Sequence, residues 1–86
     1  FHFDEHVHTI DDLQVGMVLP GIITKIANFG AFCDIGVHKD GLIHISEMAN
    51  RRITNPNEVV TLHQHVEVRV IDIDKGRGRI QLSLKK

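Results

Sequence analysis

The chain has 86 residues, 42% of them hydrophobic, and a formal net charge of -1, which describes one small domain with a modest core. Its single cysteine, Cys33, excludes a disulfide framework and indicates a reducing, cytoplasmic compartment. Because it has neither a run of about 18 apolar residues nor a basic-plus-apolar leader, we expect no membrane span and no signal peptide.

The charge is unevenly spread along the chain. Residues 1–12 carry four carboxylates and no Lys or Arg, whereas residues 13–86 hold all ten Lys and Arg against seven Asp and Glu, a net charge of +3. A mildly basic body of this kind is compatible with polyanion binding but does not require it. Since the chain begins at Phe1 and not at Met, we expect a module of a longer protein.

Residues 1–13 are predicted to form an N-terminal arm or linker end, packed loosely by its phenylalanines, ahead of the domain proper at 14–86. The pair Asp11-Asp12 predicts a turn in this arm. His6 and His8 would share one face of an extended chain and could chelate a metal. Exposed histidines without a cysteine or a defined carboxylate are a weak signal, so we expect neither a metal site nor a cofactor.

The first strand is predicted over residues 15–27, which are rich in β-branched apolar side chains. Pro20 and Gly21 in its middle would be unfavourable in a flat central strand. They fit a long strand that bends sharply and pairs with different neighbours before and after the bend, as strands of small barrels do.

Residues 28–46 predict a hairpin of two strands joined by a turn rich in Gly and Asp. Successive side chains of a strand point to opposite faces, so the strands that bury their aliphatic residues turn Phe32 and His44 outward together. The inward set is Ala31, Cys33, Ile35, Ile43 and Ile45. Phe29 joins the outward side chains if Gly30 carries a β-bulge.

The remaining chain predicts one short helix and two strands. Asn55-Pro56-Asn57-Glu58 has the pattern of a helix start, with Asn55 as N-cap and Pro56 at the first helical position. We expect this helix to plug one end of a barrel. The fourth strand covers 66–74, with a slip in its alternation at Ile71 that implies a bulge, and the fifth begins at Arg79 and alternates cleanly.

Five short strands with Gly-rich turns in under ninety residues favour an all-β fold. A five-stranded Greek-key barrel, the OB-fold, with a short helix between strands three and four, matches the strand count and the coiled first strand.

Several spaced segments then resemble one family, the S1 RNA-binding domain. They are Gly16, Val18, Gly21 and Ile26, the runs 29–32 and 41–46, and the strands 66–74 and 79–83. The resemblance covers about residues 13–85. The lead 13–21 and the segment 55–60 look most like the C-terminal copy in Tex-type transcription accessory proteins.

This resemblance implies single-stranded RNA binding on the outer face of strands two and three. The matching positions are Phe29, Phe32 and His44, flanked by Asp74 and Arg79. Two further cations, Lys25 and Arg51, are candidates for holding phosphates by charge. In one departure, His63 stands where the family usually has glycine before the fourth strand, which puts the geometry of that turn in doubt.

The favoured hypothesis is a single-stranded RNA-binding module of a larger transcription or RNA-metabolism protein, monomeric as an isolated domain, with weak base preference. Single-stranded DNA is a second candidate ligand, because the preference for RNA rests on the resemblance alone. The alternative is a protein-interaction module whose aromatic face docks on another domain of the parent protein. We expect no catalysis, since no histidine adjoins a candidate nucleophile and Ser46 and Ser83 lack a nucleophile elbow.

Overall fold

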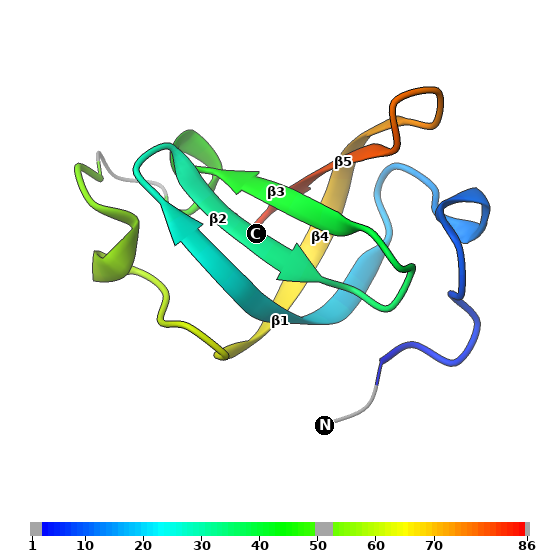
Figure 1. Ribbon diagram of the computed structural model, residues 1–86, viewed down its shortest axis with the longest axis horizontal. Coiled ribbons are helices and arrows are strands. Elements are labelled where there is room, and N and C mark those ends of the chain that lie inside the picture. Colours follow the sequence, from blue (N-terminus) through cyan, green and yellow to red (C-terminus); the bar gives the residue numbers. More distant parts are fainter. Residues whose placement is uncertain (1–2, 50–52, 86) are drawn as a thin grey trace.

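The computed structural model describes residues 3–49 and 53–85 and contains one closed barrel of five strands (Figure 1). The strands are β1 (Val18–Ala27), β2 (Gly30–Asp34), β3 (Asp40–His44), β4 (His65–Asp74) and β5 (Arg79–Ser83). Their order around the barrel is β1-β2-β3-β5-β4, with β4 pairing back onto β1. Only β3 and β5 run parallel among these pairs. The predicted all-β OB-fold barrel is confirmed.

The long first strand, β1, pairs with two different strands, as its sequence predicted. It pairs with β4 over residues 18–22 and with β2 over residues 22–27. At the bend, a Cβ on Gly21 would overlap the Sγ of Cys33 on the neighbouring strand, so only glycine allows this close approach. A register shift between Ile23 and Lys25 adds to the coiling of β1.

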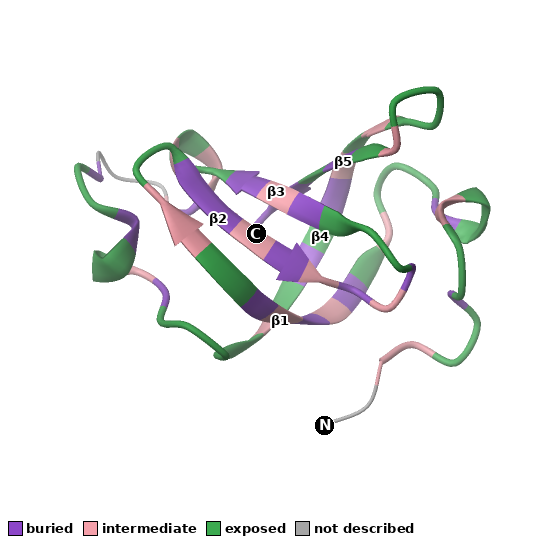
Figure 2. Cartoon of the chain, in the orientation of Figure 1, coloured by how far each residue is buried: buried purple, intermediate pink, exposed green. Residues whose placement is uncertain are grey.

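The core is filled from all five strands, and buried and less buried residues alternate along β2 and β3 (Figure 2). The N-terminal segment contributes to it as well, through the buried Val7 and Leu13. In the described part of the arm, these two aliphatic side chains pack into the core, and Phe3 is half-buried close to Gly36, whereas Phe1 lies outside the described residues. The 3-10 turn η1 (Ile10–Asp12) confirms the turn at Asp11-Asp12.

The predicted short helix is a single 3-10 turn, η3 (Pro56–Glu58). The N–H of Asn57 donates to Oδ1 of Asn55 at 3.0 Å, and Pro56 is buried at the first position, as the pattern predicted. Another 3-10 turn, η2 (Ile45–Glu47), follows β3 and was not foreseen. In the described part of the chain no helix is long and apolar enough to span a membrane.

β4 contains a bulge, and β5 ends in a buried polar residue. The slip in alternation at Ile71 is a register shift between Val70 and Asp72, which confirms the predicted bulge. Ser83, on the outward side of β5, is only 1% exposed. Its Oγ donates to a carboxylate oxygen of Glu47 at 3.0 Å, so η2 covers this end of the strand.

The turn before β4 is built on a histidine in the left-handed region. His63 has a φ of 66°, and its N–H donates to the carbonyl of Ile23 at 2.8 Å. Because this conformation strains any residue with a Cβ, we expect His63→Gly to stabilise the fold by roughly 0.5 to 1 kcal/mol in urea denaturation. The control Glu67→Gly, in the middle of β4, should instead destabilise the fold. A loss of stability in His63→Gly would show that the imidazole makes compensating contacts.

Candidate nucleic-acid interface

Phe29 is placed by a tight turn. Ala27 and Gly30 are paired across β1 and β2, so Asn28 and Phe29 form a two-residue connection, and the carbonyl of Phe29 accepts from the N–H of Ile45 at 2.8 Å. No register shift occurs at Gly30, so the condition stated for Phe29, a β-bulge at Gly30, is not met. Phe29 faces solvent because it stands in the turn, and half of its surface (50%) is exposed.

Gly30 brings β2 close to β3 beneath this turn. A Cβ at Gly30 would overlap the carbonyl oxygen of Ile43. Glycine is therefore needed for the two strands to approach as they do.

The two phenylalanine rings form a pair on the outside of the barrel. The centroids of Phe29 and Phe32 lie 6.1 Å apart and the ring planes meet at 89°, an edge-to-face arrangement. The Nζ of Lys25 lies 5.9 Å from the centroid of Phe32, within the range of a cation–π contact. The ring pair is thus fixed by its neighbours and still half open to solvent.

A row of paired residues crosses the outer face of the sheet. Lys25 of β1 is opposite Phe32 of β2, Phe32 is opposite Leu42 of β3, and Leu42 is opposite Gln81 of β5. Directly opposed residues share a face of a sheet, so these four side chains lie on one side. The outward position predicted for Phe32 is therefore correct.

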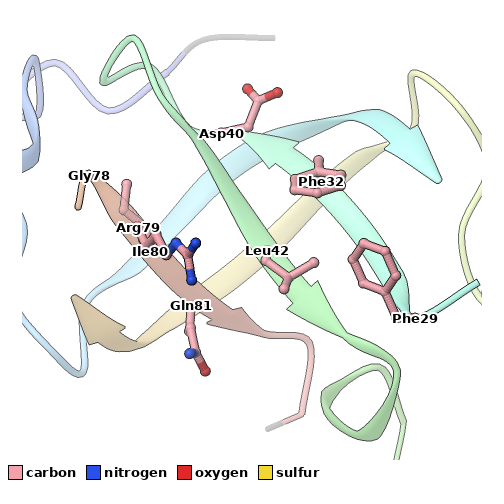
Figure 3. Close-up of a pocket in the computed structure, with 8 residues that line it drawn as sticks. All are labelled: Phe29, Phe32, Asp40, Leu42, Gly78, Arg79, Ile80 and Gln81. Atoms are coloured by element: carbon pink, nitrogen blue, oxygen red, sulfur yellow. The ribbon is translucent and has the colours of Figure 1, made fainter. Parts of the chain in front are cut away.

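A groove of about 430 Å³ runs over the last three residues of this row, Phe32, Leu42 and Gln81. Figure 3 shows the two rings on one side, Leu42 in the middle, and Arg79 and Gln81 on the other side. Its lining residues are Phe29, Phe32, Asp40, Leu42, Gly78, Arg79, Ile80 and Gln81. The groove has an apolar floor at Leu42, the cation Arg79 on one side and the carboxylate of Asp40 at one end. Such a surface can accept a flat ring that carries polar groups on its edges.

His44 is exposed on the same face as Leu42 but does not line the groove. Its Nδ1 accepts the N–H of Ser46 at 3.2 Å and lies 2.8 Å from Oγ of Ser46. A ring nitrogen that accepts from a backbone N–H is unprotonated in the neutral imidazole, so Nε2 carries the proton. His44 thus presents an N–H donor at Nε2.

The other predicted site residues separate into different positions. Arg79 lines the groove, whereas Asp74 accepts the N–H of Arg77 at 3.2 Å and holds the β4–β5 turn outside the lining. Lys25 stands beside Phe32, and Arg51 lies outside the described residues. The ammonium group of Lys39, which was not a predicted site residue, lies so close to Gly78 that an added Cβ would come within 2.8 Å of Nζ. Lys39 therefore adds a cation where Gly78 and Arg79 line the groove.

Five lining residues are not among the site residues predicted from the sequence: Asp40, Leu42, Gly78, Ile80 and Gln81. The oxygen Oδ2 of Asp40 accepts the hydroxyl of Thr24 at 3.0 Å. Extending the alternation from His44 back along β3 would have placed Leu42 and Asp40 outward.

Cys33 lies beneath this face and is fully buried. Burial raises the pKa of its thiol to about 12, and the carboxylates of Asp34 and Asp40 add to the effect. A thiol with such a pKa is inert at neutral pH, which argues against a nucleophilic role.

A closed five-stranded barrel with an open aromatic groove on the sheet β2-β3-β5 defines a member of the OB-fold class. The chain belongs to the S1 RNA-binding domain family, whose model matches residues 12–85. The resemblance seen in the sequence is thereby confirmed.

The chain is also similar to parts of longer proteins. It is 51% identical over 83 residues to the transcriptional accessory protein Tex of Neisseria gonorrhoeae and 47% identical to protein YhgF of Escherichia coli, with 96% of this chain covered in both. It spans only 11% of the length of each of these relatives.

Solved structures share the fold. One is the Pyrococcus horikoshii a/eIF2alpha-aDim2p-rRNA complex, in which a chain matches with a TM-score of 0.81 and 31% identity over 85% of this chain and 45% of that chain. Another is GSP13 from Bacillus subtilis, with a TM-score of 0.79 and 33% identity over 84% of this chain and 55% of that one.

Proposed function

We propose that this domain binds single-stranded RNA by stacking bases on Phe29 and Phe32 in the groove of β2, β3 and β5. The observation that carries the proposal is the ring pair itself, held edge to face and open to solvent beside an apolar floor at Leu42. Every base has a π-face, so such a surface accepts unpaired bases of different kinds. Membership in the S1 family supports RNA as the ligand.

The expected affinity of the isolated domain is modest. Stacking contributes about 1 to 3 kcal/mol per base, so two rings supply roughly 2 to 6 kcal/mol. Association entropy and the ordering of a flexible strand remove several kcal/mol of this. We expect dissociation constants between micromolar and millimolar, a range suited to one module among several in a longer protein.

The polar groups around the rings position the strand. Lys25 and Arg79 flank the stacking surface and would hold phosphates by charge without reading the sequence. The Nε2 donor of His44 extends the surface along β3 and can donate to a phosphate or a base oxygen. We assign Asp74 to shaping the adjacent turn rather than to direct contact with RNA.

In the parent protein, the domain would act as an RNA-binding part of a transcription accessory protein without a catalytic role of its own. This assignment rests on the similarity to Tex and YhgF. The competing role, docking of the same groove onto a neighbouring protein domain, uses the same apolar surface and is distinguished by experiment.

The deciding experiment is a titration of the 15N-labelled domain with a single-stranded RNA decamer, followed by amide NMR shifts. We expect saturable changes confined to Lys25 and to 29–34, 40–46 and 79–81, and smaller changes with DNA of the same sequence. The exposed end of β4 at 65–69 serves as an internal control. An absence of shifts at millimolar RNA would reject RNA binding and favour the protein-docking role.

Salt dependence gives a second measurement on the same complex. For single strands the slope of log K against log salt is about -0.7 per phosphate contact. With two or three cations beside the groove, we expect a slope of about -1.4 to -2.1. A slope near zero would show that the cations do not contact phosphates.

A further inference from the structure

The groove carries a carboxylate next to its stacking surface. Figure 3 shows Asp40, Phe32 and Phe29 in succession, so that a base stacked on Phe32 has Asp40 beside one edge. We infer that Asp40 is a specificity-determining residue that makes this groove favour bases with an exocyclic amino group over uracil. The inference rests on the proposed RNA binding and names the bases that the site prefers.

The carboxylate of Asp40 is oriented and keeps free acceptor capacity. Oδ2 accepts the hydroxyl of Thr24 at 3.0 Å, a bond that reaches from β3 across to β1. None of the ion pairs recorded among residues 3–49 and 53–85 uses Asp40. Since an ionised carboxylate offers about four lone-pair sites, Oδ1 remains available to a ligand.

The surroundings of Asp40 disfavour a phosphate at this end of the groove. Asp34 is directly opposite Asp40 in the β2–β3 register, so two carboxylates stand side by side. The cations Lys25 and Arg79 lie to either side of the stacking surface, and the ammonium group of Lys39 lies near Gly78 on the Arg79 side. A bound strand would therefore place its phosphates toward these cations and turn a base edge toward Asp40.

The chemistry of the base edges then decides the preference. Cytosine, adenine and guanine each carry an amino group that can donate to a carboxylate, as Asp and Glu do with the N4 amino group of cytosine. Uracil has a carbonyl oxygen at the corresponding position, and its only N–H is flanked by two carbonyls that a carboxylate repels. Cytosine and uracil are both pyrimidines of similar size, so they form a matched pair for the test.

The test measures the affinity of the domain for oligo-rC and oligo-rU decamers by fluorescence anisotropy at one salt concentration. We expect the wild type to favour rC by about three- to tenfold. In Asp40→Asn the ratio should fall to unity or reverse, because the amide can donate to the uracil oxygen. The control Glu67→Gln makes the same charge change on β4 outside the groove and should leave the ratio unchanged.

The outcomes separate this inference from the proposed function. Equal ratios in the wild type and Asp40→Asn, with both RNAs bound, overturn the role of Asp40 and leave RNA binding intact. Binding of neither RNA removes the proposed function and the inference with it. If Asp40→Asn fails to fold, Thr24→Val releases the carboxylate while keeping a β-branched side chain. We expect this variant to lower the ratio, and an unchanged ratio would overturn the inference.

Discussion

Replacing Phe32 with alanine is expected to lower the affinity for a single-stranded RNA decamer by roughly five- to 150-fold, the range that corresponds to one lost stack. Phe32 stands in the middle of the row from Lys25 to Gln81, and its edge-to-face partner Phe29 would lose its support as well. Removing this ring therefore deletes one stacking position, which sets the expected range, and leaves Phe29 without its edge-to-face contact. The measurement is fluorescence anisotropy with the RNA used in the NMR titration.

The same variant should remain folded, because Phe32 is only half-buried and points away from the core. The ring loses its contact with Phe29 and the cation–π contact with Lys25, together about 1 to 2 kcal/mol. For a domain of this size each kcal/mol lowers the melting temperature by roughly 4 to 8 °C. Circular dichroism should record a moderate decrease and an unchanged native spectrum.

Two variants serve as controls. Leu62→Ala removes an apolar side chain that is 53% exposed and lies outside the groove, so it should leave RNA affinity unchanged. Phe32→Tyr keeps a stacking ring and should retain most of the affinity. Unaltered binding by Phe32→Ala together with a collapse in stability would place this ring in the core and contradict the stacking model.

The outward positions of Phe32 and His44 could be predicted because alternation along a strand is a local property. Ala31 and Cys33 on one side of β2, and Ile43 on β3, are aliphatic or thiol side chains that a small barrel must bury. Once they are buried, the residues between them have to face outward. The bend of β1 at Pro20 was predictable for the same reason, since it depends on two adjacent residues.

The composition of the groove depends on pairing between distant strands and was harder to foresee. Leu42 and Gln81 are neighbours only because β3 and β5 run parallel, a contact between segments nearly forty residues apart. No local pattern specifies that pair, so alternation along β5 can place Gln81 outward but cannot assign it a place beside Leu42. Arg79 entered the site through the family resemblance, and its place in the groove is a result of the same pairing.

Side-chain roles at the ends of strands were likewise beyond local reasoning. Ser83 follows the outward alternation of β5 but is buried by Glu47, because the unforeseen turn η2 folds over the end of the barrel. The same turn fixes the ring of His44 through Ser46. Alternation determines which side of a strand a side chain faces, whereas the exposure of that side chain depends on the segments that pack against the strand.

Gly30→Ala is expected to destabilise the domain by roughly 2 to 6 kcal/mol, from backbone strain and overpacking together. Gly30 has a φ of 155°, and an added Cβ would overlap the carbonyl oxygen of Ile43. This oxygen belongs to the backbone of β3, so it cannot rotate away as a flexible side chain could. A domain of this size has a total stability of about 4 to 13 kcal/mol, so much of it would be lost. Urea denaturation followed by circular dichroism measures the change.

The loss should reach the binding surface as well as the core. Gly30 is paired with His44, and Phe32 with Leu42 two residues along the same strands, so moving β2 away from β3 widens the groove at its floor. We therefore expect Gly30→Ala to bind RNA more weakly than the wild type at low temperature, even after the measured affinity is corrected for the fraction of the variant that is folded. Gly76→Ala is the matched control, since a Cβ there meets only Oδ1 of Asp74 at 3.5 Å, an ordinary contact. Equal stability of the two variants would show that the strands can separate without penalty, and that Gly30 does not set the spacing on which the stacking surface depends.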